Sequence, residues 1–168
     1  MTTFVTLPYV MEPGTGLDAP IGHLGTVHKV PAYVTEGRMA AVEHTLPPKH
    51  LAAPLHRHSR EDELSFVLSG TLGAKLGDDV VIATPGSYVL KPRGQWHTFW
   101  NPGETELRIV EFLIPGGLDA YFQWLSTLIH AGQPPNQAAI ETLAAEYGLD
   151  FDFESVPALC EQFGLTFC

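Results

Sequence analysis

The sequence contains little cysteine and no long apolar segment. Its two cysteines, Cys160 and Cys168, are too few and too close together for a disulfide framework. No apolar run approaches the ~20 residues that span a bilayer. The segment Met1–Met11 has neither a basic beginning nor a long apolar core. We therefore expect no secretory signal and no membrane association, and we predict a cytoplasmic protein.

Basic residues are absent from the C-terminal part of the chain. All nine Lys and Arg lie in residues 1–108 together with eleven acids, whereas residues 109–168 contain eight acids and no Lys or Arg. The whole chain has a net charge of -10. This charge excludes nucleic acids and anionic membranes as partners, because both bind basic faces. We interpret the C-terminal acids as a solvated cap.

A helical period is also absent before residue 117. Turns rich in Gly and Pro divide this region into short apolar or alternating runs, and at least eight short strands at such spacing predict an all-β sandwich or barrel. The runs are Thr26–Thr35, Met39–Leu46, Leu64–Ser69, Leu72–Leu76, Val80–Ala83, Tyr88–Leu90, Trp96–Trp100 and Leu107–Ile114.

The pattern becomes helical after Pro115-Gly116-Gly117. We predict an extension over residues 117–168 that packs on a β-domain of residues 1–116, and it either caps the mouth of the barrel or lies outside it. The predicted signals are a helix over Leu118–His130, a break at Pro134-Pro135, a helix through Ile140 and Tyr147 that stops at Gly148, and a last helix capped by Ser155 and ended by Gly164.

Four side chains have the types and spacing of a metal site. On a strand, His56 and His58 point to the same face, so both imidazoles can reach one ion. Glu63 follows five residues after His58, and His97 follows 34 residues after Glu63. Three His and one carboxylate suit a divalent transition metal with coordination positions left open.

These residues resemble the two motifs of the cupin family, which cover residues 55–101. In one departure, His50 occupies a position where the family usually has Gly, six residues before the first motif His. The first motif reads His56-x-His58, four residues, Glu63, six residues, Gly70; the second reads Gly86, five residues, Pro92-x-Gly94, two residues, His97, three residues, Asn101.

The resemblance is to small single-domain cupins of the quercetin dioxygenase-like type. It implies an all-β fold, a cupin jelly-roll barrel (double-stranded β-helix) with a C-terminal helical extension. It also implies that His56, His58, Glu63 and His97 hold one divalent metal ion, which is Fe, Mn, Ni or Zn. A homodimer is a further expectation from the resemblance.

The function that follows from the resemblance is a metal-dependent dioxygenase acting on an aromatic, flavonol-like or polyketide-like small molecule. O₂ would be the second substrate, and Glu63 would be the catalytic base. Two alternatives stay open. One is a non-oxidative cyclase, isomerase or lyase on the same metal, and the other is a non-catalytic, metal-bearing module that binds a small molecule.

Strand alternation predicts the rest of the substrate pocket. Ser65 shares the inner face with Glu63, and Phe99 shares it with His97. We add Tyr88 as a third pocket residue. The small Ser65 side chain leaves room for a bulky substrate in a largely apolar cavity.

The same alternation places other side chains away from the pocket. Lys91 should face water, and Trp96 and Trp100 should face a second layer or a partner subunit. Glu111 interrupts an apolar strand, and it lies either at the barrel mouth or on a solvated or interface face. We favour the second placement, because an unpaired buried charge is costly.

Overall fold

The computed structural model describes residues 9–132 and 136–167 of the chain. Cys168, Pro134-Pro135 and the first eight residues of Met1–Met11 lie outside the described residues. Over the described ranges, no helix is long and apolar enough to cross a membrane.

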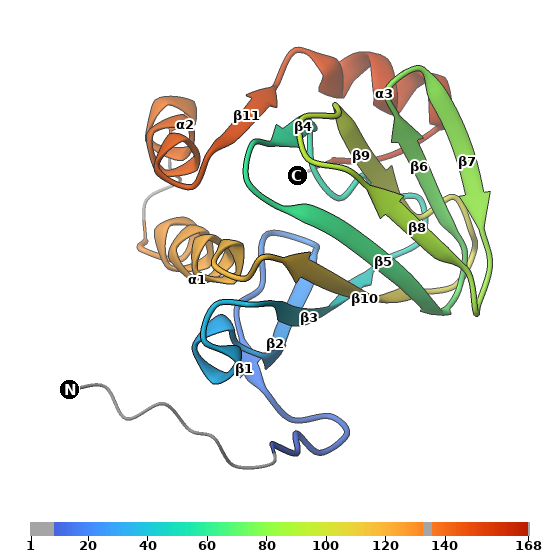
Figure 1. Ribbon diagram of the computed structural model, residues 1–168. Helices are drawn as coiled ribbons and strands as arrows, with labels where there is room; N and C mark the ends of the chain where they lie inside the picture. The colour runs from blue at the N-terminus through green and yellow to red at the C-terminus, as the bar shows by residue number, and fades with distance from the viewer. Residues whose placement is uncertain (1–8, 133–135, 168) are drawn as a thin grey trace.

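The β-strands form two antiparallel sheets that face each other, so the predicted all-β jelly-roll barrel is confirmed (Figure 1). One sheet has the strand order β1-β2-β3-β10-β5-β8, and the other has the order β11-β4-β9-β6-β7. The strand bounds are β1 Leu17–Asp18, β2 Gly25–Val30, β3 Ala40–Leu46, β4 Leu55–His58, β5 Asp62–Ser69, β6 Leu72–Leu76, β7 Asp79–Ala83, β8 Tyr88–Lys91, β9 His97–Trp100, β10 Leu107–Ile114 and β11 Leu149–Asp152.

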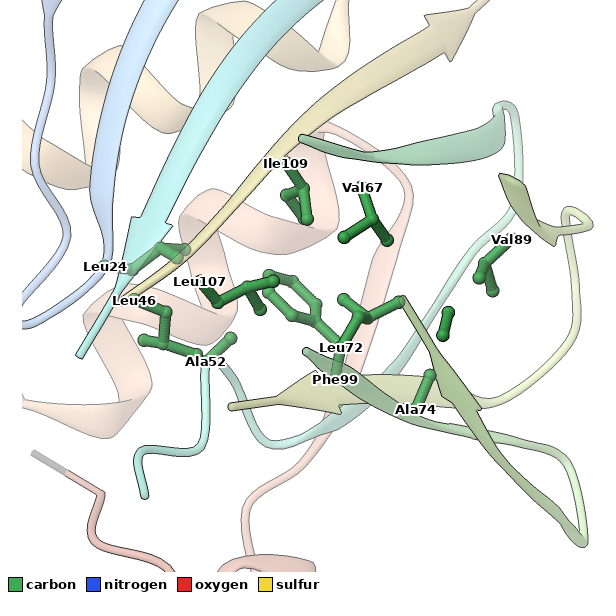
Figure 2. Close-up of a cluster of buried hydrophobic side chains, with 11 residues drawn as sticks. Leu24, Leu46, Ala52, Val67, Leu72, Ala74, Val89, Phe99, Leu107 and Ile109 are labelled. Atoms are coloured by element: carbon green, nitrogen blue, oxygen red, sulfur yellow. The ribbon is translucent and has the colours of Figure 1, made fainter. Parts of the chain in front are cut away.

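The barrel core lies between the two sheets, where the inward side chains of successive strands meet (Figure 2). Alternation produces this arrangement: β10 buries Leu107, Ile109 and Leu113, while Arg108, Val110 and Phe112 point outward or partly outward. The bounds of β6 and β10 are those that the apolar runs predict. The run Thr26–Thr35 instead divides into β2 and a 3-10 helix, η1, over Ala32–Thr35.

Gly70 ends β5 at a turn that other residues do not fit. Its φ is 79°, and a Cβ there would lie 2.6 Å from the carbonyl oxygen of Glu106. The motif glycine is therefore required by the backbone, because it lets the β5–β6 connection pass close to the loop that leads into β10.

In the described part of the chain, three helices follow the barrel, as predicted: α1 Leu118–Ile129, α2 Gln137–Glu146 and α3 Ser155–Phe163. Gly164 ends α3 in the left-handed conformation. The prediction that Ser155 caps α3 is wrong. Ser155 is the first helical residue, and its hydroxyl donates to the carbonyl oxygen of Asp152 and accepts from the amide of Leu55 on the barrel.

The tail covers the barrel in two places. At the open end, Leu118, Tyr121 and Leu125 of α1 pack with α2 and β11. On the outer face of the second sheet, α3 covers Trp100, whose ring stacks on Phe163 with centroids 4.3 Å apart. The second layer over Trp100 is therefore the chain's own helix.

The acidic tail is only partly the solvated cap that its composition suggests. Asp119 is buried, and its carboxylate accepts hydrogen bonds from the amides of Ala32 (3.0 Å) and Gly117 (3.1 Å). Asp150 pairs with Arg57 on the neighbouring strand at 2.8 Å. These two acids attach the tail to the barrel, which sequence composition alone did not indicate.

Candidate metal centre

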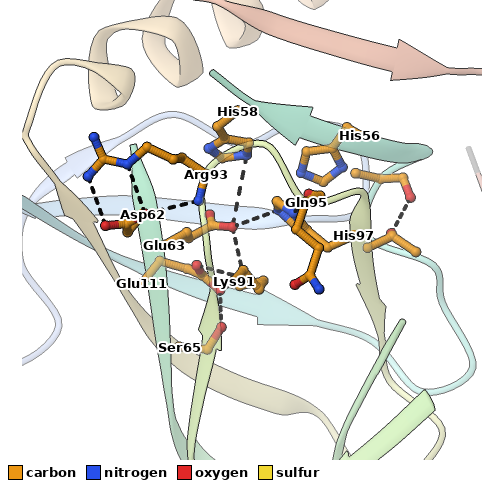
Figure 3. A network of polar contacts seen from close by, with 12 residues as sticks. His56, His58, Asp62, Glu63, Ser65, Lys91, Arg93, Gln95, His97 and Glu111 are labelled. Carbon is orange, nitrogen blue, oxygen red and sulfur yellow. Dashed lines mark hydrogen bonds and ion pairs between the residues drawn. The ribbon is translucent and has the colours of Figure 1, made fainter. Parts of the chain in front are cut away.

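Three strands bring the four predicted ligand side chains together at one end of the barrel (Figure 3). On β4, His56 and His58 are buried while Arg57 between them is exposed. His97 of β9 pairs in register with His56, and Glu63 projects inward from β5. One ligand atom from each of the four lies within 4.8 Å of the others, and all four side chains are buried.

The loop before β9 is tied to both neighbouring strands. Asp62 accepts hydrogen bonds from the backbone amide of Arg93 (2.9 Å) and from its guanidinium (2.8 and 3.1 Å). The amide of Gly94 donates to the carbonyl oxygen of His58 at 2.6 Å. These bonds fix the Pro-x-Gly turn of the second motif against the strands that carry the ligands of the first.

Backbone carbonyls orient two of the imidazoles. The Nδ1 atom of His56 lies 2.8 Å from the oxygen of Pro54, and that of His97 lies 2.9 Å from the oxygen of Gln95. A carbonyl only accepts, so both rings carry their proton on Nδ1 and turn Nε2 toward the cluster. The Nε2 of His97 lies 3.2 Å from Oε2 of Glu63, and that of His58 lies 4.0 Å from the same oxygen.

Burial keeps the imidazoles in the form that binds metals. Desolvation lowers the pKa of His56 well below its ordinary value, and the neighbouring His97 and His58 lower it further; desolvation also lowers the pKa of His58 to about 4. Burial acts to raise the pKa of Glu63, but Lys91, His58 and His97 together lower it well below its usual value. Neutral imidazoles and an ionised carboxylate are the donors that a divalent transition metal requires, so this group fits one such ion.

A buried lysine lies directly behind the cluster, contrary to the prediction that Lys91 faces water. Lys91 is 1% exposed, and its Nζ atom lies 2.9 Å from Oε2 of Glu63 and 2.8 and 2.9 Å from the two oxygens of Glu111 (Figure 3). Burial opposes the charge on Lys91, but Glu111 and Glu63 outweigh it and raise its pKa. The ammonium is therefore charged at neutral pH.

Glu111 is fully buried, so the favoured placement on a solvated face is wrong. The Ser65 hydroxyl donates to Oε1 of Glu111 at 2.5 Å. Burial and the nearby Glu63 carboxylate raise the pKa of Glu111 to about 8, although Lys91 opposes the shift. The physical reason is that one ammonium cannot balance two buried carboxylates, so one of them holds its proton.

The three predicted pocket residues take different positions. Phe99 is buried and lines the cavity next to the cluster. Ser65 is buried beneath the cluster, where it contacts Glu111. Tyr88 does not face the interior: it is 67% exposed and packs against Phe66, while Val89 and Lys91 of the same strand point inward.

The cluster faces a partly open cavity of about 300 Å³ between the barrel and the tail. His56, His58 and Glu63 form one end of it. Its other walls are almost wholly apolar. They come from the barrel and the neighbouring loops (Ile21, Leu24, Ala52, Ala53, Pro54 and Phe99), from α1 (Leu118, Tyr121, Phe122, Leu125 and Ile129), and from α2 and the β11 region (Ile140, Leu149, Phe151 and Phe153).

Sequence reasoning did not assign three polar residues of this region to the site. Lys91 and Glu111 lie beneath the cluster, and His44 lines the cavity. Charged residues in otherwise apolar strands were the available signal for the first two. For His44, position on a strand shortly before the first motif was the only signal.

The family comparison agrees with this geometry. Residues 42–113 match the family model described as a cupin domain. This segment contains all four side chains of the cluster together with Lys91 and Glu111. A search of curated proteins found no match.

Solved structures share the fold at low sequence identity. An RmlC-like cupin from Shewanella frigidimarina has a TM-score of 0.57 and 16% identity, covering 68% of this chain and 96% of its own. KdgF from Halomonas sp. has a TM-score of 0.53 and 16% identity, and the match covers 59% of this chain and 84% of KdgF. A predicted oxalate decarboxylase from Thermotoga maritima has a TM-score of 0.52 and 22% identity, covering 55% and 80%. These similarities show the jelly-roll fold.

Proposed function

We propose that this barrel, with its cupin domain over residues 42–113, is a metal-dependent enzyme, and specifically a dioxygenase that acts on an aromatic or polyketide-like small molecule. One observation carries the proposal: a buried group of three histidines and a glutamate lies at the polar end of a largely apolar cavity. A site of this kind binds an apolar body and presents a single reactive end to it.

His56, His58, Glu63 and His97 would hold the ion. A bound divalent metal would supply Lewis acidity and a template for a substrate oxygen. The residues themselves do two things. The backbone carbonyls of Pro54 and Gln95 keep the imidazoles of His56 and His97 in one tautomer, and the tail helices supply apolar walls of the cavity that the cluster faces.

Glu63 is the carboxylate that we propose as the proton acceptor, at Oε2. Lys91, His58 and His97 lower the pKa of Glu63 against the effect of burial, so it is ionised but is a weak base. A weak base takes protons efficiently only from acidic groups. Glu63 therefore suits an enol or a phenol better than an aliphatic alcohol, in agreement with an aromatic substrate.

The apolar walls also distinguish this cavity from one that binds small polyanions. The Thermotoga maritima protein that shares the fold is named as a predicted oxalate decarboxylase. Oxalate carries two charges, and outside the cluster the walls described here offer it no cation. Transfer of an unpaired charge into such a cavity is costly, so we favour an uncharged aromatic substrate.

Elemental analysis of protein purified without a histidine tag tests the metal assignment. We expect about one transition-metal ion per chain in the wild type, loss of that ion in His97→Ala, and retention in His23→Ala, which changes an exposed histidine away from the cluster. Failure of the wild-type protein to hold or take up any such ion would remove the proposal.

Oxygen-electrode screening of the metal-loaded enzyme then tests the chemistry. With flavonols, catechols and related phenols, we expect O₂ consumption that disappears in Glu63→Gln. Turnover without O₂ would instead establish the non-oxidative alternative. Binding with no turnover under either condition would establish the binding module.

We also propose a homodimer formed through the outer edge of the barrel. Val80 and Ile82 on β7 and Tyr88 and Leu90 on β8 are exposed apolar side chains on the edge strands of the two sheets. Light scattering after size exclusion should give twice the chain mass for the wild type and a monomer for Leu90→Glu. A monomeric wild type would contradict the proposal. The cytoplasmic location stays a prediction.

A further inference from the structure

Away from the cluster, the cavity walls offer few polar atoms. Tyr121 lines the cavity, but its hydroxyl oxygen is fully enclosed and makes no hydrogen bond with a described residue. The remaining polar side chain on the walls is His44 of β3, which no motif includes. If a bound molecule has a polar group away from the cluster, His44 is therefore the side chain of the described walls that can bind it.

Contacts on one edge of the His44 ring fix its orientation. Its Nδ1 atom lies 3.0 Å from the Thr26 hydroxyl and 3.4 Å from the carbonyl oxygen of Gly25, both on the adjacent β2. The ring packs edge-on against Phe122 of α1, with centroids 5.5 Å apart, and at 6.3 Å from Phe99. The imidazole is therefore clamped between the barrel and the helix that covers it.

The opposite ring edge carries a free acceptor. The Nε2 atom makes no hydrogen bond with a described residue, and it is not among the fully enclosed polar atoms, in contrast to both ring nitrogens of His28. Burial lowers the pKa of His44 to about 4, so the ring is neutral at physiological pH. The Gly25 carbonyl favours the proton on Nδ1, which leaves a lone pair on Nε2.

We propose that His44 is a second substrate-binding residue, whose Nε2 accepts a hydrogen bond from a hydroxyl or N–H group of an uncharged aromatic molecule lying in the cavity. The inference deepens the proposed function and rests on it, because the other polar end of the same molecule would meet the metal cluster. The substrate class is thus an aromatic body with two separated polar groups, one of them a hydrogen-bond donor.

A matched pair of probes tests this assignment. The probes are 2-naphthol and 2-fluoronaphthalene, which share the ring system and differ by a hydroxyl against a fluorine of similar size. Ligand-observed NMR titrations of metal-free and Zn²⁺-loaded protein give both affinities. We expect the wild type to prefer 2-naphthol by about fivefold, the effect of one net hydrogen bond.

Variants assign the preference to one atom. In His44→Phe the preference should vanish while the affinity for 2-fluoronaphthalene is kept, and His44→Gln, which retains an acceptor, should keep part of the preference. His23→Phe is the matched control and should behave as the wild type. Persistence of the full preference in His44→Phe, or its absence in the wild type, would overturn the inference.

Two further measurements separate this inference from the proposed function. Zn²⁺ content should be equal in wild type and His44→Phe. If the wild type binds no metal, the proposed function fails while the metal-free titration still tests His44. If metal binds but the preference survives in His44→Phe, only the role of His44 fails. In the wild type, the histidine ¹H–¹⁵N spectrum should show the His44 Nε2 resonance shifting with 2-naphthol alone, and no shift would count against the role even if the variants do not fold.

Discussion

Replacement of Lys91 by Met tests the buried charge network behind the cluster. Met keeps the length of the aliphatic stem and removes the ammonium, whose Nζ lies 2.9 Å from Oε2 of Glu63 and 2.8 Å from Oε1 of Glu111. Because the pKa of Glu111 is raised to about 8 by burial and by Glu63, Glu111 holds its proton at neutral pH. In metal-free Lys91→Met, the Glu63 carboxylate is then left as an uncompensated buried charge.

The cost follows from the burial of all three groups. Removal of one partner from a buried ion pair costs about 3–5 kcal/mol. For a chain of this length, each kcal/mol lowers the melting temperature by about 2–4 °C, so the metal-free variant should melt roughly 6–20 °C below the wild type. A divalent ion on Glu63 would replace the missing charge, so metal loading should reduce this difference.

Removal of the carboxylate instead of the ammonium should lower the free energy of unfolding by less. In Glu63→Gln, Lys91 loses one carboxylate but keeps Glu111 at 2.8 and 2.9 Å. Without the repulsion from Glu63, Glu111 can ionise and pair with the ammonium. The double variant, which leaves neither charge unpaired, should be more stable than the sum of the single changes predicts.

Urea and thermal unfolding of the metal-free proteins provide the assay. The series is wild type, Lys91→Met, Glu63→Gln and the double variant, with Lys75→Met on the half-buried side of β6 as the control. A Lys91→Met variant within about 1 kcal/mol of the wild type, or one less destabilised than Glu63→Gln, would refute the account of a desolvated, charged lysine.

The remaining predictions concern pH, a polar turn and the outer face of the barrel. The pKa values of His44 and His58 are lowered to about 4 by burial, so the stability that their neutral forms provide is present above pH 6.5 and is lost as pH falls through 4. Each should contribute about 3 kcal/mol of loss. Glu111 offsets part of it, because its pKa is raised to about 8 in the folded protein, so its proton stabilises the fold as pH falls from 8 to 4.5. Unfolding of the metal-free protein across this range checks the sign, and stability that rises towards pH 4 would contradict it. Asn101→Ala removes the donor to the oxygens of Leu46 and Thr105, and urea unfolding should show a loss of roughly 2–5 kcal/mol; a loss below 1 kcal/mol would mean that water replaces the amide. Tyr88→Ser should leave metal content and 2-naphthol affinity unchanged, and a drop in either would place Tyr88 in the site after all.

Local sequence pattern was enough to predict most of the barrel and the cluster. Alternation sets which strand positions face inward, so the runs Leu72–Leu76 and Leu107–Ile114 match β6 and β10. The i, i+2 spacing places His56 and His58 on one face of β4. The motif spacing then led to Glu63 and His97, which the structure brings within 4.8 Å of the pair. Each of these inferences depends on backbone periodicity or on the resemblance to the two cupin motifs. Both are properties of short, contiguous stretches of sequence.

The sequence did not show which residues of β8 point toward the core. Tyr88, Val89 and Leu90 are all apolar, so the strand has no polar face to mark the outside, and charge alone suggested that Lys91 points to water. Lys91 is buried because Glu63 on β5 balances its charge and Glu111 on β10 accepts hydrogen bonds from its ammonium. That compensation exists only once three strands have assembled.

The cavity likewise depends on contacts between distant segments. The tail was predicted to be helical, but its strand β11 and the position of α1 over the barrel mouth follow from packing against β4 and β3. His44 becomes a candidate binding residue only because Thr26 orients one edge of its ring and Phe122 of the tail packs against the ring. The residues that can bind a metal were thus encoded locally, whereas the residues around them acquired their charge and exposure from neighbours that are distant in sequence.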